Sequence, residues 1–135
     1  MVRVLSSLEI PLKIWGAAIA IAALAVSTSP AAATDASHGR AVFASQCGAC
    51  HSDARNGPVI LGPPLFGVVG RPAGSYAGFG YSSAMKSAGF VWTPDRLHSY
   101  LPAPRDYLPG VRMTYAGLKN PAQLDDLIAY LQTLK

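Results

Sequence analysis

The residues best suited to chemistry in this sequence are two closely spaced cysteines followed by a histidine. Cys47, Cys50 and His51 form a C-x-x-C-H motif, and the 135 residues contain no other cysteine. A spacing of three residues places both sulfurs on one helical face, where they can bind the two vinyl groups of one haem as thioethers. The adjacent His51 is then held beneath the iron as an axial ligand. The motif predicts one covalently attached haem c.

Three other roles for the motif have weaker support. A thioredoxin-like site places C-x-x-C between a strand and a helix start, whereas here the motif follows a helical pattern and no strand pattern is convincing. A structural zinc site needs four ligands, and only His38 and His98 remain as conventional candidates, at spacings that do not suggest a site. A plain disulfide would leave His51 without a role.

The second axial ligand must come from elsewhere in the chain. Met85 and Met113 are the methionine candidates, because Met1 falls in the leader described below. Met85 lies in a short predicted helix, where a methionine that fills the core is usual. Met113 lies in an aperiodic loop over residues 108–117, so ligation would account for it. A ligand from either remaining histidine would instead give bis-histidine iron.

The elements that position these residues are predicted to be short helices separated by long loops. Two helices are predicted over residues 36–47 and 82–88. Two more are predicted to begin at the cap-and-proline pairs Thr93-Pro94 and Asn120-Pro121. The last has the clearest period, with apolar residues at i, i+3, i+4 and i+7 from Leu124 to Leu131. Residues 56–80 are rich in glycine and proline and aperiodic, which predicts a long ordered loop held by something bound. The predicted fold class is all-α.

Composition separates an apolar leader from a globular domain. Half of the residues are apolar, only 13% are charged, and mean hydropathy is +0.26, which excludes a disordered, highly charged tail protein. Residues 14–26 form a run of 13 apolar or small residues. A membrane-spanning helix needs about 20, whereas the core of a signal peptide needs roughly 7–15. The run therefore indicates a secretory signal peptide.

We predict that this leader covers residues 1–33 and is cleaved after Ala33, because Pro30 ends the apolar run and Ala31-Ala32-Ala33 supplies an A-x-A site. A monohaem domain over residues 34–135 would then be exported to the periplasm. An uncleaved membrane anchor is the alternative. The domain holds nine Lys or Arg against six Asp or Glu, scattered along the chain, so nothing favours binding to nucleic acid.

The chain resembles the small class I cytochromes c of the mitochondrial and soluble bacterial type. The resemblance extends along residues 34–135. It is carried, in the family's order, by Gly39-x-x-x-Phe43, the C-x-x-C-H motif, Gly62-Pro63-x-Leu65, Gly67-x-x-Gly70-Arg71, Tyr81, Trp92, Tyr100-Leu101, Tyr107-Leu108-Pro109-Gly110-x-x-Met113, Ala116-Gly117 and Asp126-Leu127-Ile128-Ala129-Tyr130-Leu131. The implied architecture has short helices and long ordered loops wrapped around one covalently attached haem, with the first and last helices crossing.

The resemblance also implies roles for single residues. His51 and Met113 would be the axial ligands, a pairing that favours a relatively high reduction potential. The carbonyl of Pro63 would accept the other N–H of His51 and so set its tautomer. Tyr100 would place its hydroxyl near the methionine sulfur. Three further residues would serve the haem propionates, Tyr81 and Trp92 by hydrogen bonding and Arg71 by offsetting their charge.

Four positions implied by the resemblance are structural, and four others depart from the family. The crossing of the first and last helices would rest on Gly39, Phe43, Leu127 and Tyr130. The departures are Pro64, Met85, Gln46 and Asp106. Pro64 stiffens its loop, and Met85 stands where a polar residue is common, so we expect a drier or rearranged hydrogen-bond network near the haem. Gln46 and Asp106 thin the basic ring around the exposed haem edge.

The predicted function is electron transfer without catalysis. An iron with both axial positions filled by protein has no vacancy for substrate or oxygen. The resemblance implies a soluble periplasmic monomer that shuttles electrons from a cytochrome bc complex or a dehydrogenase to an oxidase or a photosynthetic reaction centre. Its docking surface would use Arg40, Arg105, Arg112 and Lys119. The alternatives are a dedicated haem c electron-acceptor subunit of one periplasmic dehydrogenase and, with less support, a weak peroxidase or gas-binding protein.

Overall fold

The structure is a computed structural model that describes residues 34–135. The predicted leader and its cleavage site lie outside these residues. The chain forms five helices in this part: α1 (Ala36–Gln46), α2 (Ser83–Lys86), α3 (Pro94–Tyr100), α4 (Pro104–Tyr107) and α5 (Pro121–Thr133). The β-structure within residues 34–135 is limited to an isolated bridge between Pro72 and Val91. None of the helices described is long and apolar enough to cross a membrane. The all-α prediction is confirmed.

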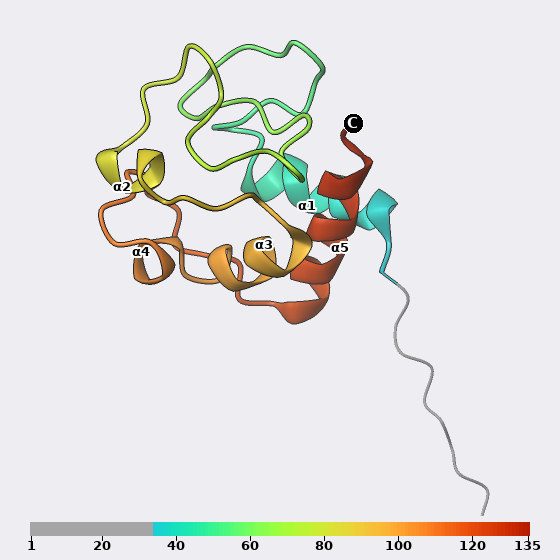
Figure 1. The fold of residues 1–135 in the computed structure, drawn as a ribbon. Helices are drawn as coiled ribbons and strands as arrows, with labels where there is room; N and C mark the ends of the chain where they lie inside the picture. Colours follow the sequence, from blue (N-terminus) through green and yellow to red (C-terminus); the bar gives the residue numbers. More distant parts are fainter. Residues whose placement is uncertain (1–33) are drawn as a thin grey trace, which may run out of the picture. The chain divides into compact units, whose positions relative to one another are not determined.

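The first and last helices cross, and small and aromatic residues meet at the crossing (Figure 1). A Cβ atom at Gly39 would overlap the backbone carbonyl of Asp126, so only glycine lets α1 approach α5 this closely. One turn further along α1, the ring of Phe43 packs against Tyr130 with the ring centroids 5.8 Å apart. The predicted crossing is therefore present, and it holds α1 against α5.

Side-chain caps explain where four of the helices begin. Asp35, Ser82, Thr93 and Asn120 each accept hydrogen bonds from backbone N–H groups in the first turn of the helix that follows. These starts agree with the predicted ones to within a residue. The sequence does not predict α4, because its four residues are too few to show a helical period and it has no side-chain cap.

Long loops complete the fold around the helices. Figure 1 shows the loop between α1 and α2 on the side of the molecule away from α3 and α4. This loop returns to the helices through backbone hydrogen bonds, including Gly67 N–H to the carbonyl of Leu134 (2.7 Å) and Gly70 N–H to that of Trp92 (2.8 Å). The aperiodic segment 56–80 is thus an ordered loop, as predicted, and it forms one wall of an internal cavity.

Candidate functional site

A cavity of about 740 Å³ lies between the long loop, the helices and the segment that follows α4. Its walls are mainly apolar, and its volume falls in the range of small-molecule and cofactor sites. All nine residues predicted for the haem site line this one cavity: Cys47, Cys50, His51, Pro63, Arg71, Tyr81, Trp92, Tyr100 and Met113. Residues up to 66 positions apart in the sequence are therefore brought to one place.

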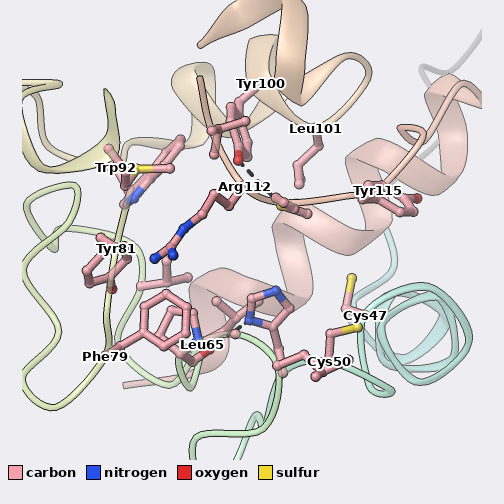
Figure 2. Close-up of a pocket in the computed structure, with 18 of the residues that line it drawn as sticks. Cys47, Cys50, Leu65, Phe79, Tyr81, Trp92, Tyr100, Leu101, Arg112 and Tyr115 are labelled. Carbon is pink, nitrogen blue, oxygen red and sulfur yellow. Dashed lines mark hydrogen bonds between the residues drawn. The ribbon is translucent and has the colours of Figure 1, made fainter. Parts of the chain in front are cut away.

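The C-x-x-C-H motif forms the turn that ends α1. The backbone N–H groups of Cys50 and His51 both donate to the carbonyl of Cys47, at 3.0 and 2.9 Å, which holds the three residues in one tight turn. Cys47 and Cys50 are not joined in a disulfide, and Figure 2 shows their sulfur atoms close together on one side of the cavity. Burial raises the pKa of the Cys47 thiol to about 11.

The imidazole of His51 is fixed by its neighbours along the loop. Its Nδ1 donates a hydrogen bond of 2.7 Å to the carbonyl oxygen of Pro63, which leaves Nε2 without a proton. Burial lowers the pKa of His51 and keeps the ring neutral, the form that binds metals. A Cβ atom at Gly62 would overlap this ring, so the glycine lets the loop close over it. His51 is thereby held as an oriented neutral base.

The sulfur of Met113 is oriented from the other side of the chain. The hydroxyl of Tyr100, on α3, donates to Met113 Sδ at 3.4 Å, and Figure 2 shows this hydroxyl pointing into the cavity. Burial raises the pKa of Tyr100 to about 12, so its hydroxyl keeps its proton and remains a donor at neutral pH. Arg105 Nε adds a contact of 3.4 Å to the carbonyl of Met113.

Polar groups also face the cavity opposite the cysteines. Figure 2 shows Tyr81 and Trp92 across the cavity from the two sulfurs. The guanidinium of Arg71 is held nearby by the carbonyl of Pro64 (Nη2, 2.9 Å), and it packs over the ring of Tyr76. The ring N–H of Trp92 makes no hydrogen bond within residues 34–135, so it is available to a bound acceptor. This end of the cavity can bind carboxylates.

The other ligand candidates have different surroundings. Met85 is buried in the core and lines the cavity, but without a polar partner for its sulfur among the residues described. His38 and His98 do not line the cavity, and each pairs with an acidic residue of α5, His38 with Asp126 and His98 with Asp125. Within residues 34–135, no three His, Cys, Asp or Glu side chains are grouped so that they could hold a metal ion. The structure thus supports neither the bis-histidine nor the zinc alternative.

Sequence reasoning missed two hydrogen bonds at the mouth of the cavity and the role of one glycine in its wall. Tyr115 donates to Gln46 Oε1 at 3.0 Å, and a guanidinium nitrogen of Arg112 donates to the carbonyl of Gly80. Gly62 leaves room in the cavity wall for the ring of His51, a role that the motif Gly62-Pro63-x-Leu65 did not indicate. A tyrosine two residues after Met113 was a possible signal, but its partner lies 69 positions earlier in the sequence. Arg112, predicted only for docking, also lines the cavity wall (Figure 2).

These residues fit the predicted haem. The cavity offers two thiols on one side, polar groups that suit carboxylates on the other, and apolar walls between them. A neutral histidine nitrogen and a thioether sulfur, each oriented by a hydrogen bond, supply the donor set that haem iron takes in electron-transfer proteins.

The comparisons with known proteins point the same way. The family model described as cytochrome c matches residues 36–135. The cytochrome c of Euglena viridis is 43% identical over 75% of this chain and 98% of its own length. The cytochrome c2 of Blastochloris viridis is 42% identical over 81% of this chain and 85% of its own length.

A solved structure gives the same result for the fold. The cytochrome cH from Methylobacterium extorquens is 41% identical and superposes with a TM-score of 0.66 over 73% of this chain and 98% of that protein. Its likeness, together with the family match, assigns the helices and loops described above to the cytochrome c fold. The chain therefore belongs to the cytochrome c family and is a monohaem electron carrier, not an enzyme, with one covalently attached haem c.

Proposed function

We propose that His51 and Met113 are the axial ligands of the haem and that Cys47 and Cys50 are its points of covalent attachment. The observation that carries this proposal is that both candidate ligands line one cavity and that a hydrogen bond orients the side chain of each, from His51 to the carbonyl of Pro63 and from Tyr100 to the sulfur of Met113. When bound, the haem supplies an iron that alternates between the ferrous and ferric states.

The chain's own residues account for the rest of the function. With both axial positions taken by side chains, no position remains for a substrate. The carbonyl of Pro63 keeps the Nδ1 proton of His51 in place, which fixes which nitrogen faces the iron. Buried apolar residues such as Leu97 and Leu127 line the walls and exclude water. Tyr81, Trp92 and Arg71 would bind the propionates.

We place this electron carrier in the periplasm, as a soluble monomer from which residues 1–33 are cleaved after Ala33. A cytochrome bc complex or a dehydrogenase would donate its electron, and an oxidase or a photosynthetic reaction centre would accept it. Four basic residues would form the docking surface: Arg40, Arg105, Arg112 and Lys119. Since the basic residues are few, attraction to an acidic partner is expected to be present but weak.

The ligand assignment is tested by replacing the methionines in turn. Ferric wild-type protein should show the weak methionine–iron charge-transfer absorption at the red edge of its spectrum. Met113→Ala should abolish this absorption, because the sulfur that binds the iron is removed. Met85→Leu is the matched control and should keep it. Survival of the absorption in Met113→Ala, or its absence from folded wild type, would contradict the assignment.

One observation favours a second candidate, the dedicated electron-acceptor subunit of one periplasmic dehydrogenase. Residues 56–70 contain no charged side chain, and three consecutive apolar residues within them are exposed: Val59 (43%), Ile60 (46%) and Leu61 (76%). Leu61 also lines the cavity. A partner that meets this wall would be matched by apolar contact, which favours one shape-complementary partner over many acidic ones.

Reaction rates with a purified candidate dehydrogenase separate the two functions. For a dedicated subunit we expect Leu61→Ser to lower the second-order rate constant severalfold, with little response to ionic strength. Val91→Ser is the control, because Val91 is also an exposed apolar residue (43%) but does not line the cavity. A steep decrease of the rate with salt, and no effect of Leu61→Ser, would favour the general shuttle.

A further inference from the structure

The segment that carries Met113 is unusual in how it is held. In residues 112–117, here called the strap, no backbone N–H or carbonyl makes a hydrogen bond to another backbone group. Backbone bonding resumes at Leu118, whose N–H donates to the carbonyl of Leu101 at 3.0 Å. The position of the Met113 sulfur therefore depends on side-chain contacts and on the two ends of the strap.

Four side-chain hydrogen bonds tie the strap to the rest of the molecule. Two come from α3 and α4, from Tyr100 to the sulfur and from Arg105 to the carbonyl of Met113. Because α3 and α4 come shortly before the strap in the chain, these two bonds join the strap to segments that are close to it in sequence. The other two, from Arg112 to Gly80 and from Tyr115 to Gln46, reach across the mouth of the cavity.

The Tyr115–Gln46 bond has the firmer anchor of these two. Gln46 is the last residue of α1 and directly precedes Cys47, and α1 is locked against α5 by the close approach at Gly39. The bond measures 3.0 Å and joins residues 69 positions apart. Figure 2 shows Tyr115 on the same side of the cavity as Cys47. The bond thus links the strap to the C-terminal end of α1.

We propose that Tyr115 and Gln46 are positioning residues that keep the strap closed and so hold the Met113 sulfur on the iron. The inference rests on the ligand assignment proposed above. Opening of the strap would carry the sulfur away and expose an axial position to external ligands. The hydrogen bond from Tyr115 to Gln46 is present in the closed strap and broken in the open one, so its loss raises the population of the open form.

Imidazole binding to the ferric holoprotein measures this population, because imidazole competes with the sulfur and bleaches the methionine–iron absorption. Tyr115→Phe removes only the hydroxyl, and Gln46→Met replaces the amide, with its acceptor oxygen, by an unbranched thioether side chain. Each is expected to raise the apparent imidazole affinity about threefold to tenfold, the effect of one neutral hydrogen bond. The double variant should bind imidazole no more tightly than either single one, since both changes break the same bond.

Two further variants separate positioning from general stability. Tyr130→Phe also removes a long-range tyrosine hydrogen bond, to Asp53, but Tyr130 does not line the cavity. It should leave the imidazole affinity at the wild-type value. Gln46→Glu keeps an acceptor oxygen in place and should stay within twofold of wild type.

The results distinguish the positioning role of Tyr115 and Gln46 from the ligand assignment on which it rests. An imidazole affinity of Tyr115→Phe equal to that of Tyr130→Phe, or fully additive effects of Tyr115→Phe and Gln46→Met, would overturn the positioning role alone. Survival of the methionine–iron absorption in Met113→Ala would overturn both proposals. If Tyr115→Phe yields no folded holoprotein, Gln46→Met tests the same bond from the opposite side.

Discussion

The two proposed axial ligands are held in physically different ways. His51 is oriented by a backbone carbonyl, that of Pro63, and by the close approach of Gly62, so its position belongs to the loop backbone. The sulfur of Met113 is oriented by a side-chain hydroxyl, that of Tyr100. A side-chain donor can be removed by a conservative substitution that leaves the backbone in place, so the methionine side is the one where redox properties can be tested cleanly.

Tyr100→Phe is expected to lower the reduction potential. The hydroxyl donates to Met113 Sδ at 3.4 Å and draws electron density from the sulfur, which disfavours the ferric state. One neutral hydrogen bond corresponds to on the order of a few tens of millivolts for one electron. Because the pKa of Tyr100 is raised to about 12, the difference should persist at every pH well below that value. Spectroelectrochemical titration measures it.

The same titration on Tyr107→Phe provides the comparison. Tyr107 packs against the ring of Tyr100 at a centroid distance of 5.7 Å, but its hydroxyl faces Arg96 and not the sulfur. Its removal should leave the potential nearly unchanged. Equal shifts in the two variants would show that aromatic packing, and not the hydrogen bond to sulfur, sets the potential.

Single residues could be predicted from the sequence where the site depends on neighbours in the chain. The spacing of Cys47, Cys50 and His51 determines how the three residues lie relative to one another, because a single turn positions all three. Met113 was indicated by the lack of any helical pattern around it. The contact between Gln46 and Tyr115 could not be predicted, because it depends on how α1 and the strap meet in three dimensions.

Among the helices described, α1 and α5 share the most extensive contact. Gly39→Ala is expected to lower the free energy of unfolding by about 1–3 kcal/mol or more, since its Cβ would overlap the backbone of α5 and neither helix can move without disturbing the other. Urea titration of the holoprotein measures the loss.

Gly80→Ala is the matched control for this substitution. It adds the same methyl group at a site where the nearest neighbouring atom is a flexible Arg112 nitrogen 3.9 Å away. Its unfolding free energy should lie within about 0.5 kcal/mol of wild type, as for most surface substitutions. A similar loss in both variants would mean that the close helix crossing is not the cause.

The helices that begin with a cap and a proline could be predicted from sequence, because both signals are local. Thr93 and Asn120 each accept a hydrogen bond from the first turn of the helix they precede. The loop over residues 56–80 could be predicted as ordered but not traced, since its path follows from contacts with Trp92 and Leu134 that lie far along the chain. The start of α4 has a proline, Pro104, but no side-chain cap.

For the molecule as a whole, the hydrophobic core and the cavity share the same side chains. Trp92, Leu97, Tyr100, Leu127 and Leu131 belong to the buried core and also line the cavity. Without a bound group, the mainly apolar walls of this cavity would face water, and these core residues would lose the group they pack around.

Protein produced without haem is therefore expected not to fold. Residues 34–135 made under haem-free conditions should lack the near-ultraviolet circular dichroism of packed aromatic rings and should unfold without a cooperative transition. The holoprotein made in parallel should show both. A cooperative thermal transition in the haem-free chain, with dispersed proton resonances, would contradict this dependence.

The way the strap is held also bears on how proteins of this design can diversify. Residues 112–116 are held by side chains and make no backbone-to-backbone hydrogen bonds, so exchanging those side chains changes how the sulfur of Met113 is held without breaking the backbone hydrogen bonds of the helices. Gly117 is excepted, because a Cβ atom there would overlap the carbonyl of Pro102. The histidine side, built into the turn that ends α1, has no such freedom. Changes in partner preference and redox midpoint can thus accumulate on one face of the cofactor while the opposite face keeps the chain foldable.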